Sequence, residues 1–450
     1  MATRTVISRK RDGRTPAGSD FPLAEGDLPA LSRQTGEPAW HAERRLSAWK
    51  TYQGIPMPGP TDEAWRRTDI RALPFGELRL KAAEDAPVDP ALLRPLAGEA
   101  HGALLVLRPG VPGQLSDNAS LASQGVVFQD LAGALRDHGG ALRDTLGTLV
   151  PDSEGKFSAL AASFAADGAV VIVPPGVKLE APLHSVLWAP GTGALFASRV
   201  LVIVGEDAAL TYVHETASPG RSDGAAAHVG SVEILVRPGA RLTFVELQTW
   251  GKHVWNFTHE RARVERDGSI DWIFGAVGSR LTKNFSTLDL VGPGAQGRMS
   301  GFYFADGAQH LDHDTQQNHL AEHTTSDLLY KGALLGKSRS VWQGMIYVAP
   351  GSQKTDGYQA NRNLVLSKQA RADSIPGLEI LADDVRCTHG ATVGQLEEEP
   401  IFYLMSRGLP RREAERMVVD GFFDPIMQRI PFEGVRERFQ QMIRAKMASS

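Results

Sequence analysis

Apolar stretches of strand length recur through the middle of the chain, and short turns rich in Gly, Pro and Asp separate them. Segments such as Arg199–Val204 and Ser231–Val236 consist largely of Val, Ile and Leu, which is typical of strands buried within a sheet. No stretch with a helical period interrupts these segments, so the pattern disfavours alternating β–α–β units. It indicates a mainly β structure from about residue 150 onward.

This strand-and-turn pattern repeats at nearly constant spacing. Each copy has an apolar stretch ending in valine, a turn that carries Gly or Asp, a small residue, and then usually an apolar residue. The copies start at Val173, Val204, Val236, Val264 and Val291, which are 31, 32, 28 and 27 residues apart. Such spacing fits one coil of a solenoid whose coils stack on one another. We therefore predict a right-handed parallel β-helix, with a large β-sandwich of recurrent hairpins as the alternative.

Amphipathic segments on both sides of the repeats predict helices. The predicted helices are Pro38–Tyr52, Asp62–Arg67, Gln129–Arg136, Pro400–Gly408, Arg411–Phe423 and Phe432–Met447. The chain thus divides into a mixed and helical domain at residues 1–150, a β-helix at 151–394 and a helical domain at 395–450. The last domain either caps the open end of the solenoid or docks a partner.

Composition narrows the functional classes. A net charge of −4 provides no basic field for nucleic acid or an anionic membrane, and no apolar run approaches the roughly 18–20 residues of a spanning helix. The basic start, MATRTVISRKRDGRTPAG, lacks the apolar core of a secretory signal. Cys387 is the single cysteine, so no intrachain disulfide can form, which suits a reducing compartment. We expect a cytoplasmic protein.

Common catalytic and nucleotide-binding motifs are absent from the sequence. It contains no Walker A motif, no GxGxxG after a strand, no HExxH, no GxSxG and no CxxC pair. Most nucleotide-binding, metalloprotease and redox functions are therefore disfavoured, and we expect this chain to bind no nucleotide. No flavin-binding motif is visible, and the sequence leaves flavin dependence open.

One candidate site combines a thiol with an imidazole. On a strand, Cys387 and His389 project to the same face, and together they offer soft and borderline metal ligands. Two ligands hold neither an iron–sulfur cluster nor a closed zinc site, so another surface or chain must supply the rest. The alternatives are a buried cysteine beside a hydrogen-bonded histidine, or a Cys–His nucleophile pair.

A second candidate is a histidine-rich segment. Four of the 13 histidines fall between His310 and His323, and we consider His310, Asp312 and His319 as ligands of a divalent metal. A catalytic site of this kind also needs a catalytic carboxylate and a convergent third histidine, and the strand phase does not clearly supply them. The alternative is a polar strand edge whose histidines bond to neighbouring coils.

Several stretches resemble the SufB/SufD family of iron–sulfur cluster assembly proteins. The resemblance spans most of the chain and is densest in its last third. The matching stretches are Pro60–Leu73 (PTDEAWRRTDIRAL), Ser326–Gly332 (SDLLYKG), Gly357–Lys368 (GYQANRNLVLSK), Ala382–Leu396 (ADDVRCTHGATVGQL) and Phe402–Ile426 (FYLMSRGLPRREAERMVVDGFFDPI). The family's fold, a right-handed parallel β-helix flanked by helical domains, agrees with the repeat pattern.

The resemblance implies a scaffold subunit rather than an enzyme. In this family, SufB and SufD chains pair through their β-helices, each binds a SufC ATPase through its C-terminal helices, and the nascent cluster forms at the SufB–SufD interface. His389 matches the histidine that the SufD branch contributes, and Cys387 matches the cysteine position beside it. A transient iron–sulfur cluster or iron would thus be shared with SufB. The sequence does not say whether the isolated chain forms a homodimer.

The SufD branch is favoured over the SufB branch, because SufB chains carry additional cysteines and place Glu on both sides of the histidine after the cluster-site cysteine. Here that stretch reads Cys387-Thr-His389-Gly-Ala-Thr, in a chain with one cysteine. Two other classes remain as alternatives. A β-helix polysaccharide lyase or hydrolase would need paired carboxylates on adjacent coils. A mononuclear metal enzyme would use the His310–His323 segment.

Overall fold

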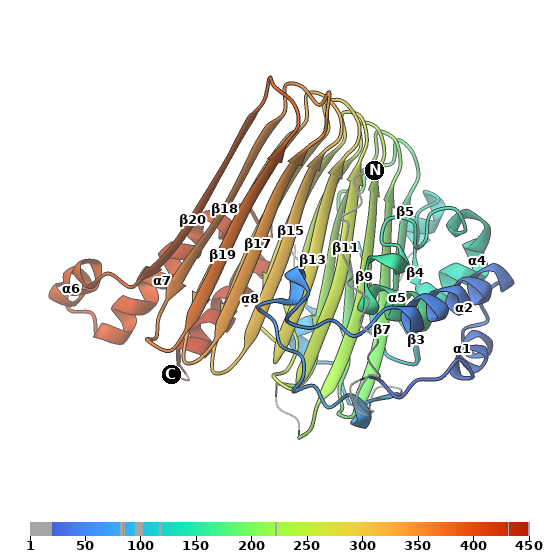
Figure 1. The fold of residues 1–450 in the computed structure, drawn as a ribbon, viewed down its shortest axis with the longest axis horizontal. Helices are drawn as coiled ribbons and strands as arrows, with labels where there is room; N and C mark the ends of the chain where they lie inside the picture. Colours follow the sequence, from blue (N-terminus) through green and yellow to red (C-terminus); the bar gives the residue numbers. More distant parts are fainter. Residues whose placement is uncertain are drawn as a thin grey trace.

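The computed structural model describes residues 20–81, 84, 86–94, 102–116, 119–220, 223–430 and 432–448; the basic start of the chain lies outside them. Its body is a parallel β-solenoid in which successive strands alternate between two ten-stranded sheets (Figure 1). Each coil contributes one strand to each sheet, so a strand pairs with the second strand after it in the sequence. The predicted solenoid with flanking helices is confirmed.

The strands form two sheets, A and B, in which neighbouring strands have the following order. Sheet A consists of β19 (Arg371–Ile380), β17 (Arg339–Val348), β15 (His310–His319), β13 (Leu281–Leu290), β11 (Val254–Val264), β9 (Ala226–Val236), β7 (Ala194–Val204), β5 (Asp167–Val173) and β4 (Val127–Asp130), with β1 (Arg79–Leu80) beside β7. Sheet B consists of β20 (Arg386–Gln395), β18 (Asp356–Val365), β16 (Thr325–Leu334), β14 (Gln296–Ala305), β12 (Ser269–Ala276), β10 (Arg241–Thr249), β8 (Ala209–Ala217), β6 (Leu183–Trp188), β2 (Ala103–Arg108) and β3 (Val111–Leu115). Only β2–β3 and β4–β5 pair antiparallel among these strands.

The sequence repeat and the structural coil are the same unit. Val173, Val204, Val236 and Val264 are ladder partners at the ends of successive strands of sheet A. The partner of Val264 in the next strand is Leu290, and the fifth repeat valine, Val291, is the first residue of the turn between β13 and β14, which is one residue longer than the turn between β11 and β12. The third residue after each repeat valine has a left-handed backbone, which Gly and Asp adopt more readily than most residues. These turn residues are Gly176, Asp207, Gly239, Asp267 and Gly294.

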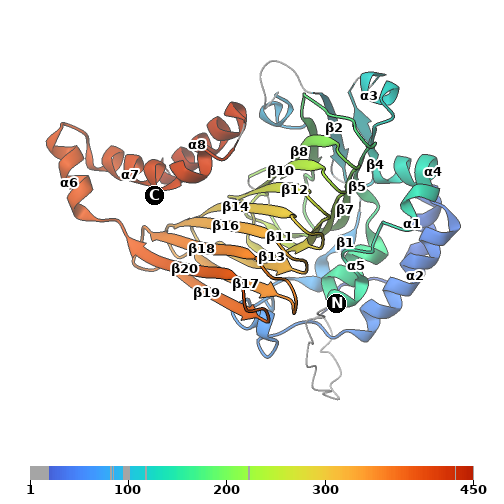
Figure 2. The same ribbon diagram turned by 90° about the horizontal axis from the view of Figure 1, so that it is seen from above.

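The N-terminal end of the solenoid is closed. Antiparallel strands β3 and β4 terminate the two sheets, and the five helices that precede β5 lie around this end (Figures 1 and 2). Helices α2 and α5 pack on the outer face of sheet A through a shared apolar cluster. The helical elements here are α1 (Asp27–Thr35), α2 (Ala39–Gly54), α3 (Ala119–Ser123), α4 (Leu131–Leu142), α5 (Lys156–Phe164) and the 3₁₀ turns η1 (Glu63–Trp65), η2 (Phe75–Glu77), η3 (Pro90–Leu93) and η4 (Asp152–Glu154). The helices predicted at Pro38–Tyr52 and Gln129–Arg136 correspond to α2 and α4. The domain boundary at residue 150 stays a prediction; strands β2 and β4, which precede it in the sequence, already belong to the two sheets.

Three C-terminal helices follow the solenoid, as predicted: α6 (Glu398–Ser406), α7 (Arg411–Met427) and α8 (Glu433–Ala448). Helices α7 and α8 cover the outer face of sheet B, whereas α6 projects away from the body (Figure 2). The Phe439 ring meets the Phe302 ring edge-on at 3.9 Å between centroids. A Cβ atom at Gly275 would lie 2.3 Å from the Phe439 ring, so the glycine permits this close approach. None of the helices in the described ranges is long and apolar enough to span a membrane.

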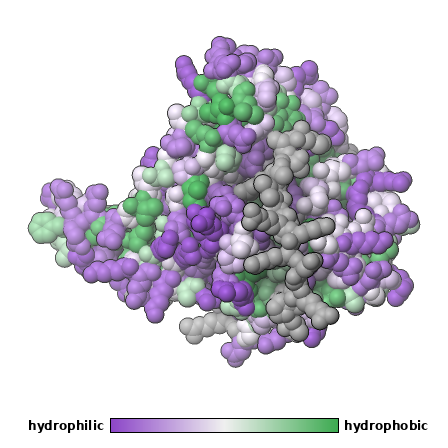
Figure 3. All heavy atoms as spheres, in the orientation of Figure 1, coloured by the Kyte–Doolittle hydropathy of each residue, from purple (hydrophilic) through white to green (hydrophobic). Residues whose placement is uncertain are grey.

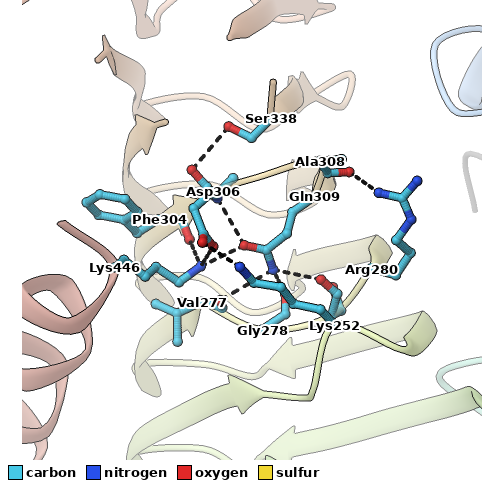
Figure 4. A network of polar contacts seen from close by, with 12 residues as sticks. Lys252, Val277, Gly278, Arg280, Phe304, Asp306, Ala308, Gln309, Ser338 and Lys446 are labelled. Carbon is cyan, nitrogen blue, oxygen red and sulfur yellow. Dashed lines mark hydrogen bonds and ion pairs between the residues drawn. The ribbon is translucent and has the colours of Figure 1, made fainter. Parts of the chain in front are cut away.

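A polar network anchors α8 to the turn between β14 and β15 (Figure 4). Lys446 Nζ donates to the carbonyl oxygen of Phe304, to Asp306 Oδ1 and to Gln309 Oε1, each at 2.7 Å. Lys252 also pairs with Asp306. Burial lowers the pKa of Lys446 to about 8, with the Asp306 carboxylate opposing that shift. The end of the last helix is therefore held by several polar bonds rather than by packing alone.

Side chains of successive coils stack in columns inside the solenoid. One column of sheet B is apolar over five coils and becomes polar in the last two. It consists of Tyr212, Phe244, Trp272, Met299, Leu328, Gln359 and His389. The apolar core thus ends before the C-terminal end of the solenoid does.

A pair of buried carboxyl groups lies in the middle of the interior. Glu246 and Glu260 are 5% and 2% exposed, and the Glu246 carboxyl hydrogen-bonds to the Glu260 carboxylate. Asn284 Nδ2 and Ser286 Oγ also donate to Glu260, at 2.7 and 2.8 Å. Burial raises the pKa of Glu260 to about 7, and burial together with the Glu260 charge raises the pKa of Glu246 well above its ordinary 4.5. The pair therefore retains a proton that both groups lose when the chain unfolds.

Glu246→Gln is expected to stabilise the protein at pH 8 and to have little effect at pH 5. Because these carboxyl groups have raised pKa values in the folded protein, they lose their protons at a lower pH in the unfolded chain than in the folded one. The free energy of unfolding therefore falls as pH rises above about 4.5. The glutamine amide keeps a donor toward Glu260 without this cost, so we expect a thermal midpoint about 2 °C higher at pH 8. Thermal unfolding of both proteins at the two pH values checks this, with Glu322→Gln in an exposed turn as control. An equal shift at both pH values would contradict the linkage.

Candidate metal-binding site at the open end of the solenoid

The C-terminal end of the solenoid is open. Strands β19 and β20 are the last members of their sheets: each pairs with one strand, β17 or β18, and no strand of the described chain pairs with its outer edge (Figure 1). Several apolar side chains are exposed at this end, including Ile380, Leu381 and Val393 at 38%, 50% and 50%. Unpaired strand edges with apolar side chains are the surfaces on which other chains add.

Cys387 and His389 lie on the inner face of the edge strand β20, as their spacing predicts. Their ladder partners in β18 are Gly357 and Gln359, which are buried, whereas the intervening Tyr358 is exposed. Because ladder partners share a face of the sheet, both side chains belong to the interior columns. Cys387 is half-buried and His389 is exposed, since no further coil covers them.

The thiol of Cys387 is held in its neutral form. Burial raises its pKa above the ordinary value of 9.0, and the Asp356 carboxylate adds to this shift, while the backbone of Gly357 opposes it. A thiol must lose its proton before it binds a metal ion. Uptake of a cation here therefore releases a proton, and metal binding weakens as pH falls.

The chain offers few ligands at this end. Across the described ranges, no group of three or more His, Cys, Asp or Glu side chains has the geometry to hold a metal ion. Cys387 and His389 by themselves would therefore make up only part of a metal-ligand set. This is the arrangement expected if a second chain, placed against the exposed edge, contributes the remaining ligands.

The histidine-rich segment forms β15, and its candidate ligands point in two directions. His310 and Asp312 lie on the outer face of sheet A, where Thr68 Oγ1 contacts both, and Asp312 also forms an ion pair with Lys283 at 2.9 Å. His319 points inward and bonds to Thr324 and Ser326. The structure therefore does not bring His310, Asp312 and His319 together, and their binding of one metal ion stays a prediction from the sequence.

Sequence reasoning missed one feature of this region: the interior position of His319 close to Cys387. A Cβ atom built on Gly357 would contact both side chains. The available signal was the coil spacing, because Ser326, Gly357 and Cys387 are 31 and 30 residues apart and stack on successive strands. Nothing in the sequence showed that a residue of sheet A would lean toward that column.

Helix α6 carries exposed apolar side chains. Phe402, Tyr403 and Met405 are 72%, 57% and 40% exposed, and Met417 of α7 is 45% exposed. Figure 3 shows hydrophobic atoms at the tip of the projection where Figure 1 places α6. Aromatic side chains are enriched at protein–protein interfaces, so this surface has the character of a docking site.

Comparison with known proteins places the chain in a family. Residues 187–422 match the family model described as "SUF system FeS cluster assembly, SufBD core domain". The Bacillus subtilis "Iron-sulfur cluster assembly protein SufB" is 29% identical over 453 residues, covering 96% of this chain and 94% of that protein. The "Iron-sulfur cluster assembly protein SufD" of the same organism is 28% identical over 435 residues, covering 96% and 99%. A "SufBD family protein" of Staphylococcus epidermidis is 28% identical over 453 residues, covering 96% and 94%. The matched core domain spans the coils from β6 to the end of the solenoid and the first two C-terminal helices, so this chain belongs to the SufB/SufD family of iron–sulfur cluster assembly proteins.

Proposed function

We propose that this chain is a SufD-like scaffold subunit of the SUF system, without enzymatic activity of its own. It pairs with a SufB-like paralogue through the open end of the solenoid and binds a SufC-like ATPase through its C-terminal helices. The nascent iron–sulfur cluster is the cargo, and Cys387 and His389 contribute to its binding at the subunit interface.

The observation that carries this proposal is the position of Cys387 and His389 on β20, whose outer edge pairs with no strand among the described residues. Thiolate and imidazole are suitable ligands for iron, but two side chains do not complete a cluster site. A second solenoid placed edge to edge would continue both sheets and bring its own ligands to the same interior column. An incomplete site shared by two chains also allows the cargo to leave when the chains move apart.

Assignment to the SufD branch rests on the ligand inventory. The chain has one cysteine, whereas an assembly subunit that holds a cluster by itself needs several thiolates. The single cysteine is also consistent with a cytoplasmic location, where disulfides are rare.

The ATPase-docking role rests on the C-terminal helices. Helix α6 exposes aromatic side chains, while α7 and α8 are fastened to the outer face of sheet B. A motion of the docked ATPase would therefore be transmitted through α7 and α8 to the coils of the solenoid. Nucleotide hydrolysis in that partner can then shift the scaffold between closed and open arrangements of the shared site.

Co-expression with both partners tests the proposed assembly. The tagged chain is co-expressed with the SufB-like and SufC-like proteins of its own host, and complexes are resolved by size-exclusion chromatography and mass spectrometry. We expect one complex containing all three chains, and a pair with the SufB-like chain when the ATPase is omitted. If the chain elutes alone in both cases, the proposed scaffold role is wrong.

A further inference from the structure

A second imidazole lies close to the Cys387 thiol inside the last coils. A Cβ atom built on Gly357 would lie 3.2 Å from Cys387 Sγ and 3.4 Å from His319 Nε2. The sulfur and the nitrogen are therefore no farther apart than the sum of these distances, about 6.6 Å. His319 comes from sheet A and Cys387 from sheet B, so the two sheets bring these groups together across the interior.

The space between the two groups exists because residue 357 is glycine. A methyl group there would also lie 3.4 Å from Ile346 Cγ2, so three side chains surround the same small volume. Ile346 and His319 are both fully buried. Gly357 is therefore flanked by an apolar side chain, a thiol and an imidazole nitrogen.

Hydrogen bonds indicate which nitrogen of His319 carries the proton. Gln317 Nε2 donates to Ser326 Oγ at 2.6 Å and to the carbonyl oxygen of Tyr358, so the acceptor within reach of the Ser326 hydroxyl among the described residues is His319 Nε2, at 2.8 Å. With Nε2 accepting from Ser326, the proton of the neutral ring is on Nδ1, and Nδ1–H donates to Thr324 Oγ1 at 2.7 Å.

This tautomer is the one that a metal-binding histidine needs. Such a histidine presents a lone pair on one nitrogen and donates from the other to a fixed partner, which orients the ring. His319 Nδ1–H is already held by Thr324, and Nε2 is directed to the side of the ring on which Cys387 lies. The buried carboxamide of Gln317 donates to Ser326 Oγ, while its own oxygen has no partner among the described residues.

We propose that His319 Nε2 and Cys387 Sγ bind the same thiophilic divalent cation, ferrous iron in the cell, as the interior part of the ligand set at the open end. This proposal rests on the proposed function and adds a ligand from a different sheet to the Cys387–His389 strand pair. Metal bonds of about 2.3 Å to sulfur and 2.0–2.1 Å to nitrogen require the two atoms to lie within roughly 4.4 Å. The proposal therefore requires the half-buried Cys387 side chain to bring its sulfur within this distance of His319 Nε2 when the metal ion binds.

Cobalt(II) binding to the purified full-length chain tests the proposal, because a thiolate–cobalt bond gives a charge-transfer absorption that a nitrogen or oxygen ligand does not. Wild-type protein is titrated with Co²⁺ under anaerobic conditions. We expect Cys387→Ser to abolish the charge-transfer band and His319→Gln to weaken Co²⁺ binding at least about tenfold. His323→Asn is the matched control, because His323 is an exposed histidine of the following turn and asparagine tolerates its φ of 57°.

A second variant leaves both ligands in place. Gly357→Ala fills the space between them, and we expect it to weaken Co²⁺ binding as His319→Gln does, with an unchanged thermal midpoint or a small decrease. This variant decides the matter if His319→Gln does not fold. Wild-type affinity in both His319→Gln and Gly357→Ala, or a wild-type protein without a thiolate–cobalt band, would overturn the proposal. Partner binding is measured separately by the co-expression experiment, so failure of this inference is distinguishable from failure of the scaffold role.

Discussion

Phe402→Asp is expected to remove the SufC-like ATPase from the assembled complex while the SufB-like partner stays bound. Phe402 is 72% exposed on α6 and lies beside the exposed Tyr403, so the substitution does not disturb the core. Buried aromatic anchors at interfaces contribute about 2 kcal/mol or more, which corresponds to a loss of affinity of roughly 30-fold or greater. An aspartate at the same position adds the cost of burying a charge.

The measurement is ATPase retention after affinity purification of the tagged chain, with affinity determined by calorimetry on the separated subunits. Val111→Asp is the control, because Val111 is a 41%-exposed apolar residue of β3 at the opposite, closed end of the solenoid. We expect this control to retain both partners. If Phe402→Asp binds the ATPase as tightly as the unmodified chain does, the docking role of α6 is wrong.

Cys387→Ser and His389→Ala are each expected to leave the three-chain complex intact and to lower its iron–sulfur content. Both side chains lie on the inner face of an edge strand and make no contribution to the packed core of the earlier coils. Removing a residue that only hydrogen-bonds to a metal ligand typically lowers metal affinity about 10–100-fold. Removing a ligand itself is therefore expected to lower the affinity at least about tenfold. Iron and acid-labile sulfide per complex, measured after anaerobic reconstitution, report the effect.

Thr388→Ala provides the matched control for these ligand variants. Thr388 lies between the two ligands on the opposite, exposed face of β20, so its loss changes the same strand without changing the interior column. We expect wild-type cluster content in this variant. Wild-type content in both Cys387→Ser and His389→Ala would instead favour the structural alternative, in which the pair has no role in cargo binding.

The exposed edge also bears on the state of the isolated chain. Two copies placed edge to edge through β19 and β20 would extend each sheet in the same way as the proposed heterodimer. A homodimer in the absence of the SufB-like partner is therefore compatible with the proposed function. Competition between the two pairings would make the measured oligomeric state depend on the concentration of the partner.

The sequence by itself determined the repeating architecture. The repeat valines mark the ends of successive sheet A strands, and Gly or Asp three residues later supplies the left-handed turn that each coil requires. These features are local, since strand burial depends on side-chain type and turn geometry depends on which residues tolerate positive φ. The three C-terminal helices were predictable for the same reason, because an amphipathic period is a property of one segment. The shared face of Cys387 and His389 follows from the two-residue period of a strand.

Only the tertiary structure decided which distant residues meet. Spacing grouped His310, Asp312 and His319 as candidate ligands, but residues an odd number of positions apart on one strand face opposite sides of the sheet. His319 therefore points inward, and Thr68 from the N-terminal region contacts the outer pair, His310 and Asp312. The approach of His319 to Cys387 across Gly357 depends on the lateral register of two sheets that are not hydrogen-bonded to each other. That register results from packing of the whole interior and leaves no local trace in the sequence. The open end of the solenoid is likewise a property of the assembled sheets, because an edge exists only where the last strand finds no neighbour.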